Sequence, residues 1–119
     1  MFDRIDHVGI AVEEIDSALE LWRDGFQLDV GENHIELLAP LGPDTPVGKF
    51  LAKRGPGLHH VAYQVPDIDA ALSAIAESGV PLIDKQPRSG IGGTRVAFLQ
   101  PKGTGRVLTE IVEPAAGAH

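Results

Sequence analysis

Two histidines and two glutamates interrupt apolar segments of the chain. His7 and His60 come early in two alternating segments, and Glu36 and Glu110 interrupt the stretches IELL and VLTEIV. Imidazole and carboxylate together suit divalent metals such as Co²⁺, Ni²⁺, Mn²⁺, Fe²⁺ or Zn²⁺. Four such ligands leave two positions of an octahedron open for a bidentate substrate. The residue types therefore predict a metal centre formed by His7, Glu36, His60 and Glu110.

An internal repeat places the two histidines at equivalent positions. Residues 5–19 match residues 58–72 without a gap, so that His7 falls on His60. Each copy begins with apolar residues at every second position, as in a strand, and continues with apolar residues at helical spacing. Such a repeat is typical of a duplicated module. If the two modules face one another, the two histidines and the two glutamates come together on one concave face.

The two copies differ in the length of chain between the histidine and the glutamate. Glu110 follows His60 by 50 residues, but Glu36 follows His7 by only 29. The first module is therefore 21 residues short, about one β-hairpin's worth of chain. Helices are expected at about 13–24, 47–54 and 67–78, and strands, besides the two that open the repeats, at 26–30, 34–38, 80–84, 94–100 and 106–113.

These elements predict an α+β fold of two repeated βαβββ-type modules that form a curved mixed sheet. The first module lacks about one hairpin's worth of chain. We expect a single domain over residues 1–119. It would comprise module one at about 4–46, a linker helix at about 47–56, module two at about 57–113 and a disordered tail at 114–119.

Composition argues against several classes of protein. The net charge of −7 argues against nucleic-acid binding, and the absence of cysteine excludes disulfides and thiolate ligands. No apolar run reaches the roughly 18–20 residues of a membrane helix, so we expect no membrane partner and a cytoplasmic location. Residues 1–47 carry a charge balance of −9, whereas residues 48–119 carry +2. The second region is either ordinary surface charge or a cationic surface for an anionic ligand.

Three longer segments resemble methylmalonyl-CoA epimerases, which belong to the vicinal-oxygen-chelate superfamily. They are IDHVGIAV, IELLAPLGPDTPVGKFLAKRGPGLHHVAYQV and GIGGTRVAFLQPKGTGRVLTEIVE, so that the resemblance runs from about residue 4 to residue 113. It implies the fold of that superfamily, with a divalent metal, Co²⁺ or another of Ni²⁺, Mn²⁺, Zn²⁺ and Fe²⁺, held by the four residues named above. It also implies methylmalonyl-CoA or a related acyl-CoA as the substrate and a homodimer as the assembly.

The resemblance further implies a reaction in which a base removes the proton at C2 and an acid returns a proton on the other face. In the family the base is a glutamate on a strand between the first helix and the third ligand, and that stretch is missing here. In FQLDV, Asp29 alternates with apolar residues, and a short turn to HIELL would place Asp29 or Gln27 opposite Glu36. Asp29 is therefore the hypothetical replacement base, and Glu110 is the second catalytic candidate.

The segment PKGTGR resembles an active-site loop of the same family. Its cations Lys102 and Arg106 are candidates for binding the phosphates of coenzyme A, although solvated surface charge is the alternative for each. Other cations that could share this role are Lys49, Lys53, Arg54 and Arg88. Three other functions remain open: a glyoxalase-like enzyme, a ring-cleaving dioxygenase, and a catalytically degenerate protein that binds a metal and a small molecule.

Overall fold

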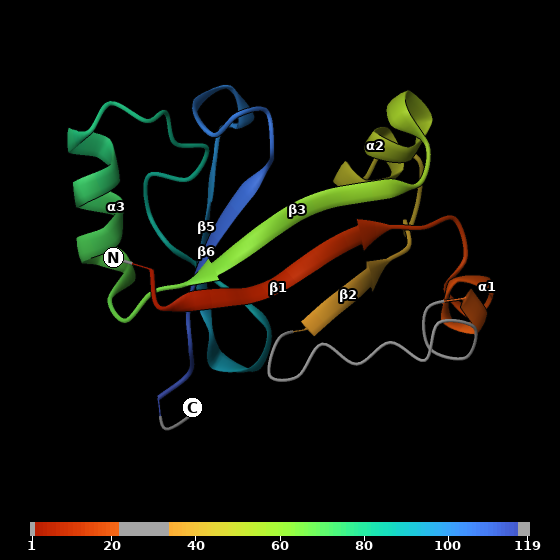
Figure 1. Ribbon diagram of the computed structural model, residues 1–119, viewed down its shortest axis with the longest axis horizontal. Coiled ribbons are helices and arrows are strands. Elements are labelled where there is room, and N and C mark those ends of the chain that lie inside the picture. Colours follow the sequence, from red (N-terminus) through yellow and green to blue (C-terminus); the bar gives the residue numbers. More distant parts are fainter. Residues whose placement is uncertain (1, 22–33, 117–119) are drawn as a thin grey trace. The chain divides into compact units, whose positions relative to one another are not determined.

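The computed structural model describes residues 2–21 and 34–116 (Figure 1). Six strands form one sheet in the order β2-β1-β3-β6-β5-β4. The strands and helices are β1 (Arg4–Ala11), α1 (Ile15–Leu19), β2 (His34–Leu38), α2 (Pro46–Arg54), β3 (Gly57–Gln64), α3 (Ile68–Glu77), β4 (Arg88–Ser89), β5 (Arg95–Leu99) and β6 (Thr109–Glu113). β2 runs parallel to its neighbour β1, and β6 runs parallel to its neighbour β3. β5 is antiparallel to both β4 and β6. The predicted α+β fold with a mixed sheet is confirmed.

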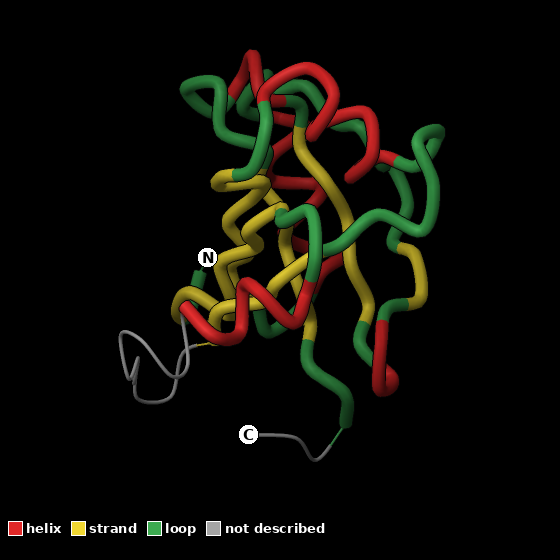
Figure 2. Tube along the Cα trace, turned by 90° about the vertical axis from the view of Figure 1, so that its right-hand side faces the viewer, coloured by secondary structure: helices red, strands yellow, loops and turns green. Residues whose placement is uncertain are grey.

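The chain forms two compact units. The first unit comprises the residues up to Asp6 together with those from His60 onwards, and so contains the second module. The second unit comprises His7–His59. Figure 2 shows how helices, strands and loops alternate along the chain. None of the helices in the described parts of the chain is long and apolar enough to cross a membrane.

The first unit has its core between α3 and the sheet. Apolar residues recur along α3 at the spacing that makes one stripe, and this stripe is buried. The Asp67 side chain accepts a hydrogen bond from the amide of Ala70 at 3.1 Å and so caps the start of the helix. The helix ends before Gly79, whose φ of +87° is readily adopted only without a side chain. The buried core consists of Val65, Ile68, Ala71, Leu72, Ile75, Ala97, Leu99 and Ile111.

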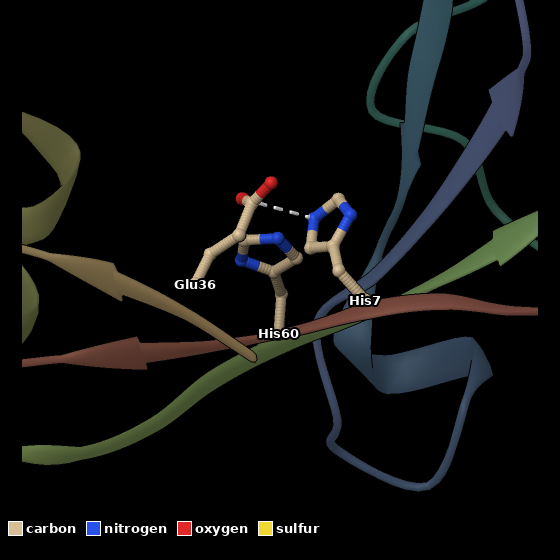
Figure 3. A group of neighbouring side chains, drawn as sticks. All are labelled: His7, Glu36 and His60. Carbon is tan, nitrogen blue, oxygen red and sulfur yellow. Dashed lines mark ion pairs between the residues drawn. The ribbon is translucent and has the colours of Figure 1, made fainter. Parts of the chain in front are cut away.

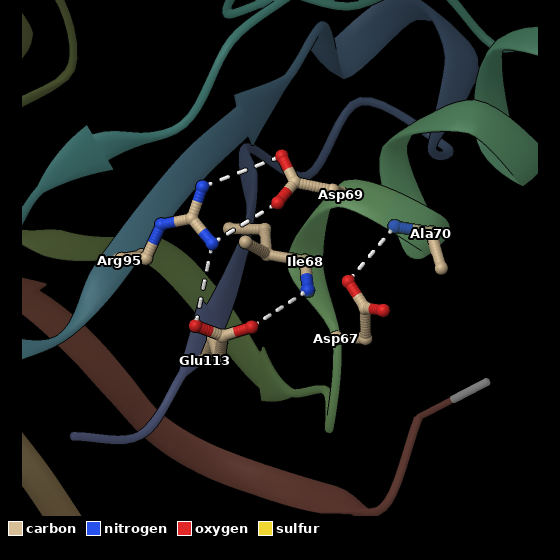
Figure 4. A network of polar contacts seen from close by, with 6 residues as sticks. All are labelled: Asp67, Ile68, Asp69, Ala70, Arg95 and Glu113. Atoms are coloured by element: carbon tan, nitrogen blue, oxygen red, sulfur yellow. Dashed lines mark hydrogen bonds and ion pairs between the residues drawn. The ribbon is translucent and has the colours of Figure 1, made fainter. Parts of the chain in front are cut away.

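A polar network fixes the first turn of α3 to the neighbouring strands (Figure 4). Both terminal nitrogens of Arg95 donate to the Asp69 carboxylate, at 3.1 and 3.3 Å. One oxygen of Glu113 lies 3.5 Å from Arg95, and the other accepts the amide hydrogen of Ile68 at 3.2 Å. The hydrogen bond to Asp69 raises the pKa of Arg95, so that its charge is retained at any ordinary pH. The network therefore positions α3 on β5 and β6.

Two predicted strands of the second module differ from the structure. The stretch 80–84 makes only a bridge between Leu82 and Leu99, because Pro81 has no amide hydrogen to donate to a ladder. The two-residue strand β4 pairs with β5 further along. The expected strand at 106–113 begins only at Thr109, since the preceding residues form a 3₁₀ helix and a turn. The second module nevertheless has the predicted βαβββ order.

The second unit has less regular structure in its described part. The helix predicted at 13–24 is present as α1 over five residues, none of them buried. The predicted strand at 26–30, with Gln27 and Asp29, lies outside the described residues. The helix predicted at 47–54 is present as α2, which Thr45 caps by accepting the amide hydrogen of Gly48 at 3.1 Å.

Candidate metal centre

In the second unit, β1 and β2 bring a histidine and a glutamate together. The parallel register pairs Gly9 with Glu36, and His7 stands two residues before Gly9 on the same face of the strand. The Nε2 atom of His7 lies 3.4 Å from Oε2 of Glu36, as the dashed line in Figure 3 marks. The His7 side chain is buried, whereas that of Glu36 is 48% exposed. This arrangement is a half-site with one buried imidazole and one carboxylate open to solvent.

In the first unit, β3 and β6 repeat this arrangement. The register pairs Ala62 with Glu110, and His60 stands two residues before Ala62. The Nε2 atom of His60 lies 3.2 Å from Oε1 of Glu110. Both side chains are buried, and Glu110 is only 9% exposed. Phe98, the register partner of Glu110 on β5, places its ring edge-on to His60 at 5.7 Å between centroids.

The two half-sites are therefore built in the same way. In both, the glutamate pairs with the residue two positions after the histidine, on a parallel neighbouring strand. The sequence repeat had shown this equivalence only for the first strands, because the offset of 53 that aligns the histidines does not align the glutamates. The strand pairing extends the repeat to the glutamates.

The chemistry of these side chains fits a divalent metal. Burying a carboxylate is costly unless it is paired or binds a cation, and Glu110 is buried beside an imidazole nitrogen. Within one unit, His7 and Glu36 are neighbouring side chains that could each offer a ligand atom to a metal ion (Figure 3). The donors are nitrogen and carboxylate oxygen, which suit Co²⁺, Ni²⁺, Mn²⁺, Fe²⁺ or Zn²⁺. The geometry does not favour any one of these metals over the others.

The remaining candidate residues belong to other stretches of the chain. Lys102 belongs to the 3₁₀ helix Pro101–Gly103, and Arg106 follows in the turn before β6; both are exposed. Asp29 lies outside the described residues. Arg88 pairs with Asp84 at 3.1 Å and places its guanidinium carbon 5.7 Å from the centre of the Phe98 ring.

Two further histidines, His34 and His59, lie on β2 and β3. His59 packs edge-on against Phe50 of α2, at 5.1 Å between ring centroids. His34 is the first residue of β2, as expected from the strand predicted at 34–38, and is in register with His7. Phe98 was not singled out, although the alternation of RVAFL places it on the face opposite the buried Ala97 and Leu99.

Comparisons with known proteins agree on one family. The profile of the Glyoxalase/Bleomycin resistance protein/Dioxygenase superfamily matches residues 24–98. The uncharacterized protein YqjC of Bacillus subtilis is 35% identical, with 98% of this chain and 96% of the relative covered. An ethylmalonyl-CoA/methylmalonyl-CoA epimerase of Cereibacter sphaeroides is 33% identical, with 93% and 98% covered. A solved methylmalonyl-CoA epimerase in complex with methylmalonyl-CoA and NH₄⁺ has a TM-score of 0.89 at 35% identity, with 98% and 97% covered.

The comparison with YqjC also bears on the short first module. The alignment spans 135 positions, although the whole chain has 119 residues. The relative therefore has residues at positions where this chain has none. This agrees with the shortfall of 21 residues between the two histidine-to-glutamate distances.

Proposed function

The chain belongs to the Glyoxalase/Bleomycin resistance protein/Dioxygenase superfamily, and we propose that it is an isomerase of the methylmalonyl-CoA epimerase type. Its substrate would be methylmalonyl-CoA or a related acyl-CoA, in which C2 lies between a thioester and a carboxylate. The reaction would remove the proton at C2 and return one on the opposite face. No redox chemistry is involved.

The observation that carries the proposal is the His-Glu pair that recurs in identical register on two parallel strand pairs. We propose that His7, Glu36, His60 and Glu110 together bind one divalent metal. Similarity over nearly the whole chain to an epimerase solved with methylmalonyl-CoA and NH₄⁺ supports an acyl-CoA as the ligand of the proposed site. When bound, the metal would stabilise the negative charge that develops on the substrate oxygens as C2 loses its proton.

The chain's own residues would divide the remaining work. His60 and Glu110 are buried and fixed by their strands, so they would hold their positions when substrate enters. Glu36 is partly exposed and can adjust to the ligand. Asp29 is our proposal for the base at C2, from its place in the sequence beside the strand of Glu36. Glu110, already proposed as a ligand, is the second catalytic candidate.

The test is deuterium entry at C2. Metal-loaded protein is mixed with methylmalonyl-CoA in D₂O, and exchange is followed by NMR or mass spectrometry against metal-free protein. We expect exchange that depends on metal and that is lost in Glu110→Gln. Exchange at the uncatalysed rate, with the metal shown to be bound, would contradict the proposal.

The assignment of the base has its own control. Asp29→Asn removes the carboxylate while keeping the size of the side chain, and we expect exchange to fall by about 100-fold or more. The neighbouring variant Gln27→Ala serves as the matched control. Unchanged exchange in Asp29→Asn would exclude this residue as the base.

A protein that binds an acyl-CoA without turnover is the second candidate. It is favoured by the positions of the YqjC alignment at which this chain has no residue, since a shortened module can retain ligands and lose a base. Tight metal binding and acyl-CoA binding without deuterium exchange would identify it.

We further propose a cytoplasmic homodimer. Within residues 2–21 and 34–116, β2 is the last strand at one side of the sheet, and a strand in that position offers unpaired backbone groups to a partner. Light scattering on a size-exclusion column checks the assembly, and a monomer mass at micromolar concentration would contradict it.

A further inference from the structure

A phenylalanine in the first unit contacts both an arginine and a proposed metal ligand. Phe98 on β5 pairs in register with Glu110 on β6, and Arg88 on β4 pairs with Val96, two residues before Phe98. Residues paired across neighbouring strands point to the same face, as do residues two apart on one strand. Arg88, Phe98 and Glu110 therefore share one face of the sheet, and His60 lies on that face as well.

The stretch before β4 restrains Phe98 in two ways. One oxygen of Asp84, Oδ2, accepts the amide hydrogen of Phe98 at 2.9 Å and a guanidinium hydrogen of Arg88 at 3.1 Å. Arg88 places its guanidinium carbon 5.7 Å from the centre of the Phe98 ring, which is a cation–π contact. The Asp84 side chain is only 16% exposed, so both hydrogen bonds are partly shielded from water. The backbone of Phe98 and the cation over its ring are thus held by the same carboxylate.

The same phenyl ring contacts the imidazole of His60. The two ring centroids are 5.7 Å apart and the ring planes are at 77°, which is an edge-to-face arrangement. The Nε2 atom of His60 also lies 3.2 Å from Oε1 of Glu110. An imidazole binds a metal through a lone pair in the plane of its ring, so the orientation of that plane determines where the metal can bind. The contacts with Phe98 and Glu110 together restrict this orientation.

We infer that Phe98 is a positioning residue for His60 and that Asp84 and Arg88 hold its ring in place. The inference rests on the proposed metal centre and adds residues that do not themselves bind the metal. Without the ring the imidazole is less restricted, and ordering it when the metal binds then costs conformational entropy. Arg88 thereby acts within the protein rather than on the phosphates of coenzyme A.

A second set of side chains of the same types provides the matched control. Arg54 places its guanidinium carbon 5.9 Å from the centre of the Phe50 ring, and Phe50 packs edge-on to His59 at 5.1 Å between ring centroids. His59 precedes His60 in the sequence but is not a proposed ligand. Phe50→Leu and Arg54→Ala therefore remove the same kinds of contact from a histidine that does not bind the metal.

The experiment compares Phe98→Leu, Phe98→Tyr and Arg88→Ala with the control variants Phe50→Leu and Arg54→Ala. Each protein is titrated with Co²⁺ and followed by absorption, which gives the affinity and, from the spectrum, the geometry of the ligands. NMR of the histidine ring hydrogens in the metal-free proteins measures the shift that the phenyl ring imposes on His60. Urea unfolding measures the stability of every variant separately.

We expect Phe98→Leu to bind Co²⁺ about tenfold more weakly, with a changed spectrum, and to lose the ring-induced shift of His60. Phe98→Tyr keeps the ring and should retain the affinity and the spectrum of the parent protein. Arg88→Ala should lie between the parent and Phe98→Leu in affinity, because the ring remains but loses its cation. Phe50→Leu and Arg54→Ala should match the parent in Co²⁺ affinity even where their stability falls.

The same Co²⁺ affinity and spectrum in Phe98→Leu as in the parent would overturn the inference and leave the metal centre standing. An equal loss of affinity in Phe50→Leu would also overturn it, because the effect would then come from general destabilisation. Deuterium exchange by the parent tests the epimerase proposal separately, since Co²⁺ binding without exchange contradicts that proposal and not this inference. A parent protein that binds no Co²⁺ would overturn the metal centre and this inference together.

Discussion

The two strand pairs that carry the histidines and glutamates have the same register but different surroundings. β3 and β6 belong to the unit in which α3 covers a buried core, and their His60 and Glu110 are both buried. In the other unit α1 buries no residue, and Glu36 is 48% exposed. The same geometry is therefore supported by a packed core in one module and by little regular structure in the described part of the other.

The difference indicates a division of labour between the modules. Buried ligands on packed strands resist displacement because moving them disturbs the core. An exposed glutamate can move with little cost, since water replaces its contacts. We expect the second module to determine stability and metal affinity, and the first to tolerate change. The variants below test this comparison, from the largest expected effect to the smallest.

The largest effect is expected from the core of α3. Ile68 is fully buried, so Ile68→Ala should lower the free energy of unfolding by about 2–5 kcal/mol. Leu19 occupies the corresponding helix of the first module and is only partly buried, so Leu19→Ala should cost about 1 kcal/mol. Urea unfolding of both variants measures the two values. Equal losses would show that both helices contribute equally to the fold.

The next effect concerns the metal. Glu110→Gln places an amide next to His60 in a buried position, and we expect metal affinity to fall on the order of 100-fold. Glu36→Gln keeps an oxygen donor on a partly exposed side chain, so its loss should be on the order of tenfold or less. Titration with Co²⁺, followed by absorption, gives both constants. A larger loss in Glu36→Gln would reverse the proposed roles.

The sequence predicted the order of elements in the second module and the strand faces of the two histidines, because both depend on local patterns. Alternation in the opening strands predicted the faces of His7 and His60, and helical spacing predicted α3 within one residue at each end. The strand predicted at 80–84 was wrong. Its apolar pattern indicated a strand, but Pro81 interrupts the ladder of hydrogen bonds that would define one.

Other features depend on pairing between distant segments. The register of Glu36 opposite Gly9 could not be obtained from the repeat, because the two modules differ in length before the glutamate. The left-handed backbone conformation of Arg106 could not be predicted from the sequence either. A sequence with Gly103 and Gly105 indicates a turn but does not show that the next residue also has a positive φ.

Helix capping should produce a smaller difference. Asp67 caps α3, so Asp67→Ala should lower the free energy of unfolding by about 1 kcal/mol. Glu14 stands at the corresponding position of α1, where its carboxylate accepts the Ser17 hydroxyl at 3.4 Å but caps no backbone amide of the helix. Glu14→Asp should therefore gain a few tenths of a kcal/mol at most. Thermal unfolding of both variants checks the pair, and a stabilising effect of Asp67→Ala would contradict the capping role.

The smallest effect is expected where the second module has a polar tie and the first does not. Glu113 accepts the amide hydrogen of Ile68 and pairs with Arg95, whereas Ala39 stands at the matching position after β2. Glu113→Ala makes the second module resemble the first at this point. Because Glu113 is partly exposed and water can replace its contact with the amide, the loss should be about 0.5–1 kcal/mol. Glu113→Gln keeps the acceptor for the amide and should lower the free energy of unfolding by less. If the two variants lose the same amount, the attraction to Arg95 and not the bond to the start of α3 is what Glu113 supplies; amide hydrogen exchange at Ile68 distinguishes these, since only loss of the bond exposes that amide.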